Sequence, residues 1–227
     1  GLMARTLPKA ALLRSAHLLK PGQPLDLPAF TEALTAAGYA RCQQVEGVGQ
    51  FAVRGGILDV FSPLMEKPVR CELFGDEIDS MGLFDPASQR RVQNVTEALI
   101  LPCAEVLPHL AEGGLPGLAD AMEAQAKRLR RRQGTEKIVE TILSDAQQLR
   151  GGVLPGGLDR YLPLIHPQFT TALDYLDPAS LVFLCEGGRI DQRAKTTLLQ
   201  LRQEADTLME AGCMAGEGAD LLLSENA

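Results

Sequence analysis

Tryptophan is absent from the 227-residue chain, and all aromatic residues together make up only 4 % of it. A surface on which nucleic-acid bases stack needs exposed aromatic rings, so this scarcity disfavours such a platform. The formal net charge of −7 likewise disfavours a protein whose main work is to grip phosphates. No apolar run approaches the ~20 residues that cross a bilayer, and no secretory signal is visible. We therefore expect a cytoplasmic protein without membrane contact.

The side chains that hold metals are few and scattered. The five cysteines never form a C-x-x-C pair, and the three histidines are equally far apart. A structural zinc site needs clustered ligands at short spacing, so we expect no metal site. The cysteines are then expected to be reduced thiols.

The motifs of common enzymes are also missing. There is no P-loop, no G-x-S-x-G elbow and no H-E-x-x-H helix. The run from Gly47 through Gly49 to Ala52 matches a loose dinucleotide fingerprint, but the residues after it alternate like a strand instead of opening a helix. The acidic pair Asp76 and Glu77 is typical of a solvated turn. We expect no catalytic residues, no cofactor and no enzymatic activity in this chain.

Residues 1–102 read as a first domain. Asp26 is a suitable N-cap for a helix that ends at Gly38. From residue 39 to about residue 101 the hydrophobic period changes to two, which favours strands. The dipeptides at 55–56 and 75–76 each interrupt this alternation, and Gly75-Asp76 suits a two-residue hairpin turn. The pattern predicts a compact, mostly antiparallel sheet with one helix.

Residues 103–227 have a different character. Two apolar stripes at helical spacing, separated by Gly134, predict a helical hairpin. Residues 181–184 read as a buried strand, and a third long helix follows at 194–208. Residues 1–102 carry a net charge of −1 and residues 103–227 a net charge of −6. The whole chain is therefore expected to be an α+β protein of two domains.

A basic run at the end of the first hairpin helix is the sharpest charge feature. Its cations are Lys127, Arg128, Arg130, Arg131 and Arg132. One interpretation is a helix end that contacts nucleic-acid phosphates. The other is a solvated helix face whose cations lie favourably near the C-terminus. Leu129 continues the apolar stripe through the run, which favours the second interpretation.

One face of the predicted sheet has the composition of a binding surface. Because alternate strand residues share a face, Arg70, Glu72 and Phe74 point one way while Val69, Cys71 and Leu73 point toward the core. Arg54 lies in the neighbouring segment. Arginine and aromatic residues are enriched in interface hot spots, so this face is a candidate partner site. The alternative is that Phe74 merely caps the sheet edge and the arginines pair with Glu72 or Asp79.

The hairpin at Gly75-Asp76 also makes a prediction about register. A regular two-residue turn would place Glu72 opposite Asp79. Like charges directly opposite each other are unfavourable. A nearby arginine or a different register would relieve this repulsion.

Three blocks of this chain resemble the bacterial transcription-repair coupling factors (Mfd). They are FAVRGGILDVF at 51–61, PVRCELFGDEIDS at 68–80 and FDPASQR at 84–90. Weaker similarity continues through LPGGLDRYLPL at 154–164 and the apolar residues 181–184. The matching part of the family is its N-terminal region, which is similar to the repair protein UvrB. The corresponding region of UvrB itself is the second choice.

The resemblance implies a specific architecture and function. Residues 1–102 would be a module like the second domain of UvrB that docks UvrA. Residues 103–227 would be the second half of a split, RecA-like domain without ATPase activity. The positions that match the family's UvrA contacts are Arg54, Arg70 and Phe74. In the full-length family members, RNA polymerase and double-stranded DNA bind to regions that this chain lacks, and ATP and magnesium bind to a separate motor. The resemblance therefore implies that this chain is a non-catalytic docking fragment.

Overall fold

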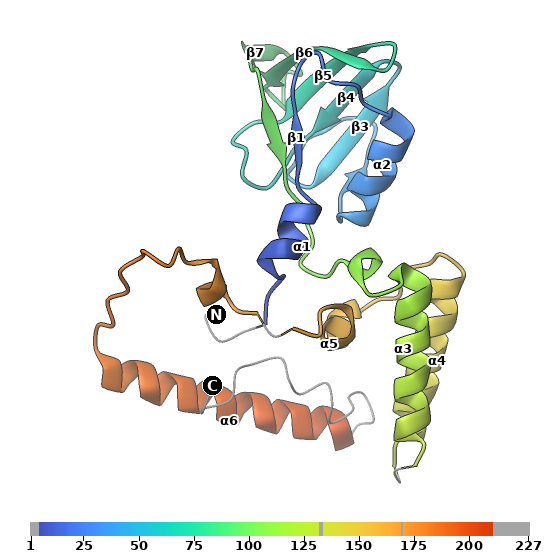
Figure 1. Cartoon of the computed structure of the whole chain (residues 1–227), viewed down its shortest axis with the longest axis vertical. Coiled ribbons are helices and arrows are strands. Elements are labelled where there is room, and N and C mark those ends of the chain that lie inside the picture. The colour runs from blue at the N-terminus through green and yellow to red at the C-terminus, as the bar shows by residue number, and fades with distance from the viewer. Residues whose placement is uncertain (1–4, 132–133, 169, 211–227) are drawn as a thin grey trace. The chain divides into compact units, whose positions relative to one another are not determined.

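A computed structural model describes residues 5–131, 134–168 and 170–210 of the chain (Figure 1). The chain divides into two compact units, Ala10–Leu107 and the residues on either side of it. Helices and a mostly antiparallel sheet make it an α+β protein, as predicted. Among the described residues, no helix is long and apolar enough to span a membrane. The identities of the two units as named domains remain predictions.

The unit Ala10–Leu107 is built on a six-stranded sheet with the order β2-β3-β4-β5-β6-β7. Its strands are β2 (Ala40–Arg41), β3 (Gln50–Arg54), β4 (Ile57–Val60), β5 (Val69–Phe74), β6 (Glu77–Phe84) and β7 (Arg91–Asn94). All neighbours pair antiparallel except β2 and β3, which are parallel. Two further strands, β1 (His17–Leu19) and β8 (Ala98–Ile100), form a separate antiparallel pair. The sheet is thus a meander that brings sequence neighbours side by side.

Helix α2 (Leu27–Ala36) packs its apolar side on the core of this unit (Figure 1). Asp26 caps it as predicted, because its carboxylate accepts a hydrogen bond from the Ala29 amide at 3.0 Å. Phe30 and Leu34 join strand residues such as Phe51 and Cys71 in one buried cluster. A short helix, α1 (Lys9–Arg14), precedes β1 and was not predicted. It has a single buried residue, so its apolar periodicity is too short to detect.

The β5–β6 hairpin confirms the turn but not the regular register. Phe74 pairs with Glu77 across the two-residue turn, and Gly75 has φ +62°, where glycine is favoured. A bulge between residues 72 and 73 then places Glu72 opposite Ser80 rather than Asp79. The Ser80 hydroxyl donates to the Glu72 carboxylate at 2.9 Å. The bulge therefore separates the two like charges, which a regular ladder would have opposed.

The second unit contains the predicted helical hairpin, formed by α3 (Gly114–Leu129) and α4 (Glu136–Arg150). The two helices lie side by side (Figure 1) and bury the stripes read from the sequence. On α3 these include Leu118, Met122 and Leu129, and on α4 Ile138 and Ile142. Gly134, in the connection, has φ +76°. The helical period thus placed the hairpin correctly.

Shorter elements complete the second unit. They are η1 (Pro108–Leu110), η2 (Leu158–Tyr161), α5 (Leu162–Ile165), η3 (Ala172–Tyr175) and the long α6 (Gly187–Glu210). Several hydrogen bonds join residues 5–7 to the rest of this unit, among them one from the Arg5 guanidinium to the His166 carbonyl at 2.7 Å. The Thr6 amide donates to the Thr170 carbonyl at 2.9 Å, and the Tyr175 hydroxyl donates to the Leu7 carbonyl.

The prediction of a buried strand at 181–184 is wrong. These residues have no regular structure, and Leu181 and Phe183 are 84 % and 82 % exposed. A strand must satisfy its backbone hydrogen bonds with a neighbour. None of the described residues of this unit forms a strand that could provide one. The apolar composition of residues 181–184 therefore favoured a strand, but the described part of this unit has no neighbouring strand to pair with it.

Candidate partner-binding surface

The three residues predicted to form a partner site lie on one face of the six-stranded sheet. Arg70 stands directly opposite Asp59, and Asp59 stands opposite Ala52, two residues before Arg54. Opposed residues in an antiparallel ladder share a face, and so do residues two apart along a strand. Phe74 follows Arg70 on the same face. The opposite face carries Val69 and Cys71, both fully buried in the core.

Asp59 is the centre of this surface. Its side chain is only 1 % exposed, yet it carries a carboxylate in the middle of β4. Arg70 binds it with two parallel hydrogen bonds, Nε to Oδ1 at 2.7 Å and Nη2 to Oδ2 at 2.8 Å. Arg54 adds a third, Nη2 to Oδ2 at 2.7 Å. Arg54 and Arg70 therefore both pair with Asp59, whereas the alternative interpretation had paired them with Glu72 or Asp79.

Arg70 is held from several sides. Besides its two bonds to Asp59, it donates to the backbone carbonyl and side-chain oxygen of Gln89, each at 3.3 Å. Its guanidinium lies 4.5 Å from the centre of the Phe84 ring. The hydrogen bonds that Arg70 donates to the Asp59 carboxylate raise the pKa of Arg70 above its ordinary value. At 16 % exposure, this side chain has little freedom left.

Arg54 and Phe74 are far more accessible. The Arg54 side chain is 44 % exposed, and Phe74, beside the hairpin turn, is 85 % exposed. Burying an aromatic ring releases a large apolar area from water, so a free ring at a hairpin tip suits an anchor for a partner. The surface thus combines a supported cation, an exposed cation and an exposed ring.

Asp59 and Gln89 were missed by the sequence interpretation. A signal for Asp59 existed, because a charged residue inside the apolar strand 57–60 must be paired if it is buried. Gln89 had no comparable signal. Its role depends on a backbone with φ +59° that aims its side chain at Arg70 and at the Val45 carbonyl.

The basic run ends α3 and begins its connection to α4. Lys127, Arg128, Arg130 and Arg131 are exposed, while Leu129 between them is buried at 1 %. Arg132 lies outside the described residues. Leu129 thus keeps its place in the apolar stripe, as the solvated-face interpretation requires. Contact of this run with DNA remains a prediction.

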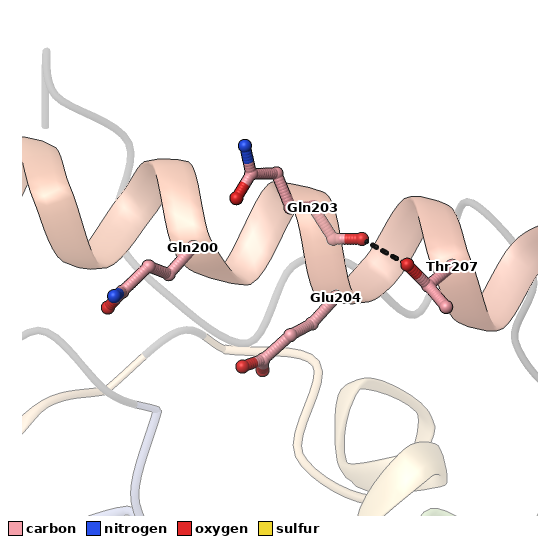
Figure 2. A pocket seen from close by; sticks show the side chains of 4 residues that line it. All are labelled: Gln200, Gln203, Glu204 and Thr207. Carbon is pink, nitrogen blue, oxygen red and sulfur yellow. Dashed lines mark hydrogen bonds between the residues drawn. The ribbon is translucent and has the colours of Figure 1, made fainter.

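The described residues offer no obvious chemical centre elsewhere. A pocket beside α6 is lined by Gln200, Gln203, Glu204 and Thr207, all from one helix (Figure 2). The Thr207 hydroxyl is tied to the Gln203 carbonyl at 2.8 Å. In the same described ranges, no three His, Cys, Asp or Glu side chains are grouped to hold a metal. Cys42, Cys71, Cys103 and Cys185 are free thiols.

Comparison with known proteins places the sheet and the whole chain in context. Residues 18–105 match the UvrB interaction domain family. The chain is 35 % identical over 207 residues to the transcription-repair-coupling factor of Myxococcus xanthus, covering 89 % of this chain and 17 % of the relative. It is 32 % identical over 207 residues to that of Escherichia coli K12, covering 91 % and 16 %. The chain thus spans about a sixth of the length of these relatives. It is a segment of the transcription-repair-coupling factor family that contains a UvrB interaction domain.

Proposed function

We propose that the sheet unit docks UvrA, and that Arg54, Arg70 and Phe74 form the contact surface. The observation that carries this proposal is the 85 % exposure of Phe74 on the face that also carries two arginines. Covering such an exposed aromatic ring with a partner removes a large apolar area from water, which favours binding. Together with a match to the UvrB interaction domain, this geometry favours protein docking over catalysis.

The three residues of the surface would contribute to UvrA binding in different ways. Phe74 supplies an apolar anchor, since burying an aromatic side chain is among the largest contributions to an interface. Arg54 supplies charge-assisted hydrogen bonds through its exposed edge. Most of the donor groups of Arg70 are already hydrogen-bonded to Asp59 and Gln89. Arg70 therefore mainly stabilises the surface, and only its remaining exposed edge is available to UvrA.

Calorimetric titration of the chain with purified UvrA tests this proposal. Arg54→Ala and Phe74→Ala are each expected to weaken binding by about 2 kcal/mol, which corresponds to roughly 30-fold in affinity. Arg70→Ala is a weaker test, because it also disturbs Asp59.

Two matched controls lie in the other unit. Phe183→Ala removes an equally exposed ring, and Arg193→Ala removes an exposed arginine of α6. Both controls are expected to bind UvrA like the parent chain. Unchanged affinity in both Arg54→Ala and Phe74→Ala, with the fold intact, would place the UvrA site elsewhere.

The remaining roles extend from the family and are part of the same proposal. The second unit would be half of a split, RecA-like domain that does not hydrolyse ATP. In the whole protein, RNA polymerase, double-stranded DNA and the ATP-driven motor would involve other regions. A direct DNA contact through the basic run is the alternative function, and an affinity for duplex DNA that falls steeply with salt would separate it from docking.

A further inference from the structure

The buried carboxylate of Asp59 has a consequence for docking that reaches beyond the three predicted contact residues. Asp59 sits in β4 between β3 and β5, and 1 % of its side chain is exposed. Burying a carboxylate is unfavourable unless it is paired and hydrogen-bonded. Both of its oxygens are used, Oδ1 by Arg70 and Oδ2 by Arg70 and Arg54 together. The carboxylate therefore joins the two arginines into one unit.

The two arginines depend on Asp59 to different degrees. Arg70 has further support from Gln89 and from the Phe84 ring. For Arg54, the bond to Asp59 is the one side-chain hydrogen bond found within the described residues. Loss of the carboxylate would thus leave Arg70 partly anchored and release Arg54 to many rotamers.

The free edge of Arg54 indicates what it would bind. A guanidinium has five N–H donors in a fixed fork, and Asp59 uses one nitrogen of Arg54. Two guanidiniums around one carboxylate leave a local charge of about +1. A carboxylate matches both the fork geometry and the charge. Holding the side chain in place before contact lowers the entropy lost on binding.

We propose that Asp59 is the positioning residue of the docking surface, holding Arg54 so that its outer edge meets a carboxylate of the partner. This inference rests on the proposed function. Asp59 does not touch the partner, and it acts through Arg54. The partner's complementary site is accordingly an acidic side chain next to an apolar pocket for Phe74.

The test is a double-mutant cycle with UvrA and the full chain. Asp59→Asn keeps the shape and one acceptor oxygen for Arg70, but removes the charge that holds Arg54. It is expected to weaken UvrA binding about tenfold in the parent chain and in the Phe74→Ala background. In the Arg54→Ala background the same change is expected to weaken binding by less than about twofold, because residues acting as one unit are non-additive. Asp59→Glu, which restores the charge, is expected to recover part of the affinity.

A second readout does not involve UvrA. The NMR order parameter of the Arg54 Nε–H bond is expected to fall in Asp59→Asn, while that of Arg70 changes less. An unchanged order parameter would overturn the positioning role. So would a UvrA affinity that Asp59→Asn lowers equally with and without Arg54, or does not lower at all. Normal binding by both Arg54→Ala and Phe74→Ala would instead overturn the proposed function, and the NMR result would still decide whether Asp59 holds Arg54.

Discussion

Replacing Arg70 with methionine tests whether the ion pair under the docking surface supports the sheet. The change removes the two-pronged partner of Asp59, while the new side chain fills part of the space over Phe84. Breaking one side of a fully buried ion pair costs about 3–5 kcal/mol. Arg70 keeps 16 % exposure and Arg54 still donates to Asp59, so we expect a smaller loss, about 2–3 kcal/mol.

Cys71 provides the assay, because it neighbours Arg70 in β5 and is fully buried. Its thiol can be alkylated only when the sheet opens, and burial also raises its pKa to about 12. The rate of alkylation follows the population of the open form when closing is fast. A loss of 2–3 kcal/mol would raise that rate roughly 30- to 150-fold. Peptide mass spectrometry separates Cys71 from the exposed Cys185, which serves as an internal reference.

Arg41→Met is the matched control, since Arg41 is an exposed arginine on the edge strand β2. It is expected to leave alkylation of Cys71 unchanged. An alkylation rate of Arg70→Met within about threefold of the parent rate would show instead that the pair with Asp59 contributes little to the stability of the sheet.

Two further predictions concern the basic run and the buried thiol. We expect no measurable binding of duplex DNA by fluorescence anisotropy at low salt. The DNA alternative would be favoured instead by an affinity for DNA that falls steeply as salt rises. That affinity should also be lost when alanine replaces the four described cations, Lys127, Arg128, Arg130 and Arg131. Because burial raises the pKa of Cys71 in the folded state to about 12, well above the ordinary value of a thiol, the folded state retains a proton that the unfolded chain loses as pH rises. The free energy of unfolding should therefore fall from about pH 9 upward, and Cys71 should contribute at most about 1.4 kcal/mol per pH unit to this fall. Denaturant titrations of Cys71→Ala should show a shallower dependence on pH. An equal pH slope in the parent chain and in Cys71→Ala would contradict this assignment.

Local patterns predicted much of the sheet unit. Alternation along 69–74 assigned Cys71 to the core and Phe74 to the open face, and both assignments are confirmed by burial. The Asp26 cap and the Gly75 turn are also confirmed. Such features depend on neighbours one to four residues away, so a single sequence contains the necessary information.

Features that depend on distant partners were not predictable in this way. The sequence allowed a nearby arginine or a different register to relieve Glu72, and could not choose between them. The structure has both, because a bulge places Glu72 opposite Ser80 and Arg91 Nη1 lies 3.3 Å from the Glu72 carboxylate. The residues 181–184 have the composition of a strand but no neighbouring strand in the described part of their unit. Pairing partners are supplied by the fold, and strand propensity alone cannot create them.

By itself the sequence determined the periodicities, the caps and turns, and the shared face of Arg70 and Phe74, while it placed Arg54 only in a neighbouring segment. Only the tertiary structure decided how these three side chains differ. It placed the carboxylate of Asp59 between two arginines, so that one became a largely buried support and the other kept an exposed edge. The physical reason is that a buried charge must find its counter-charges in three dimensions, and three strands had to align before Asp59 could meet both.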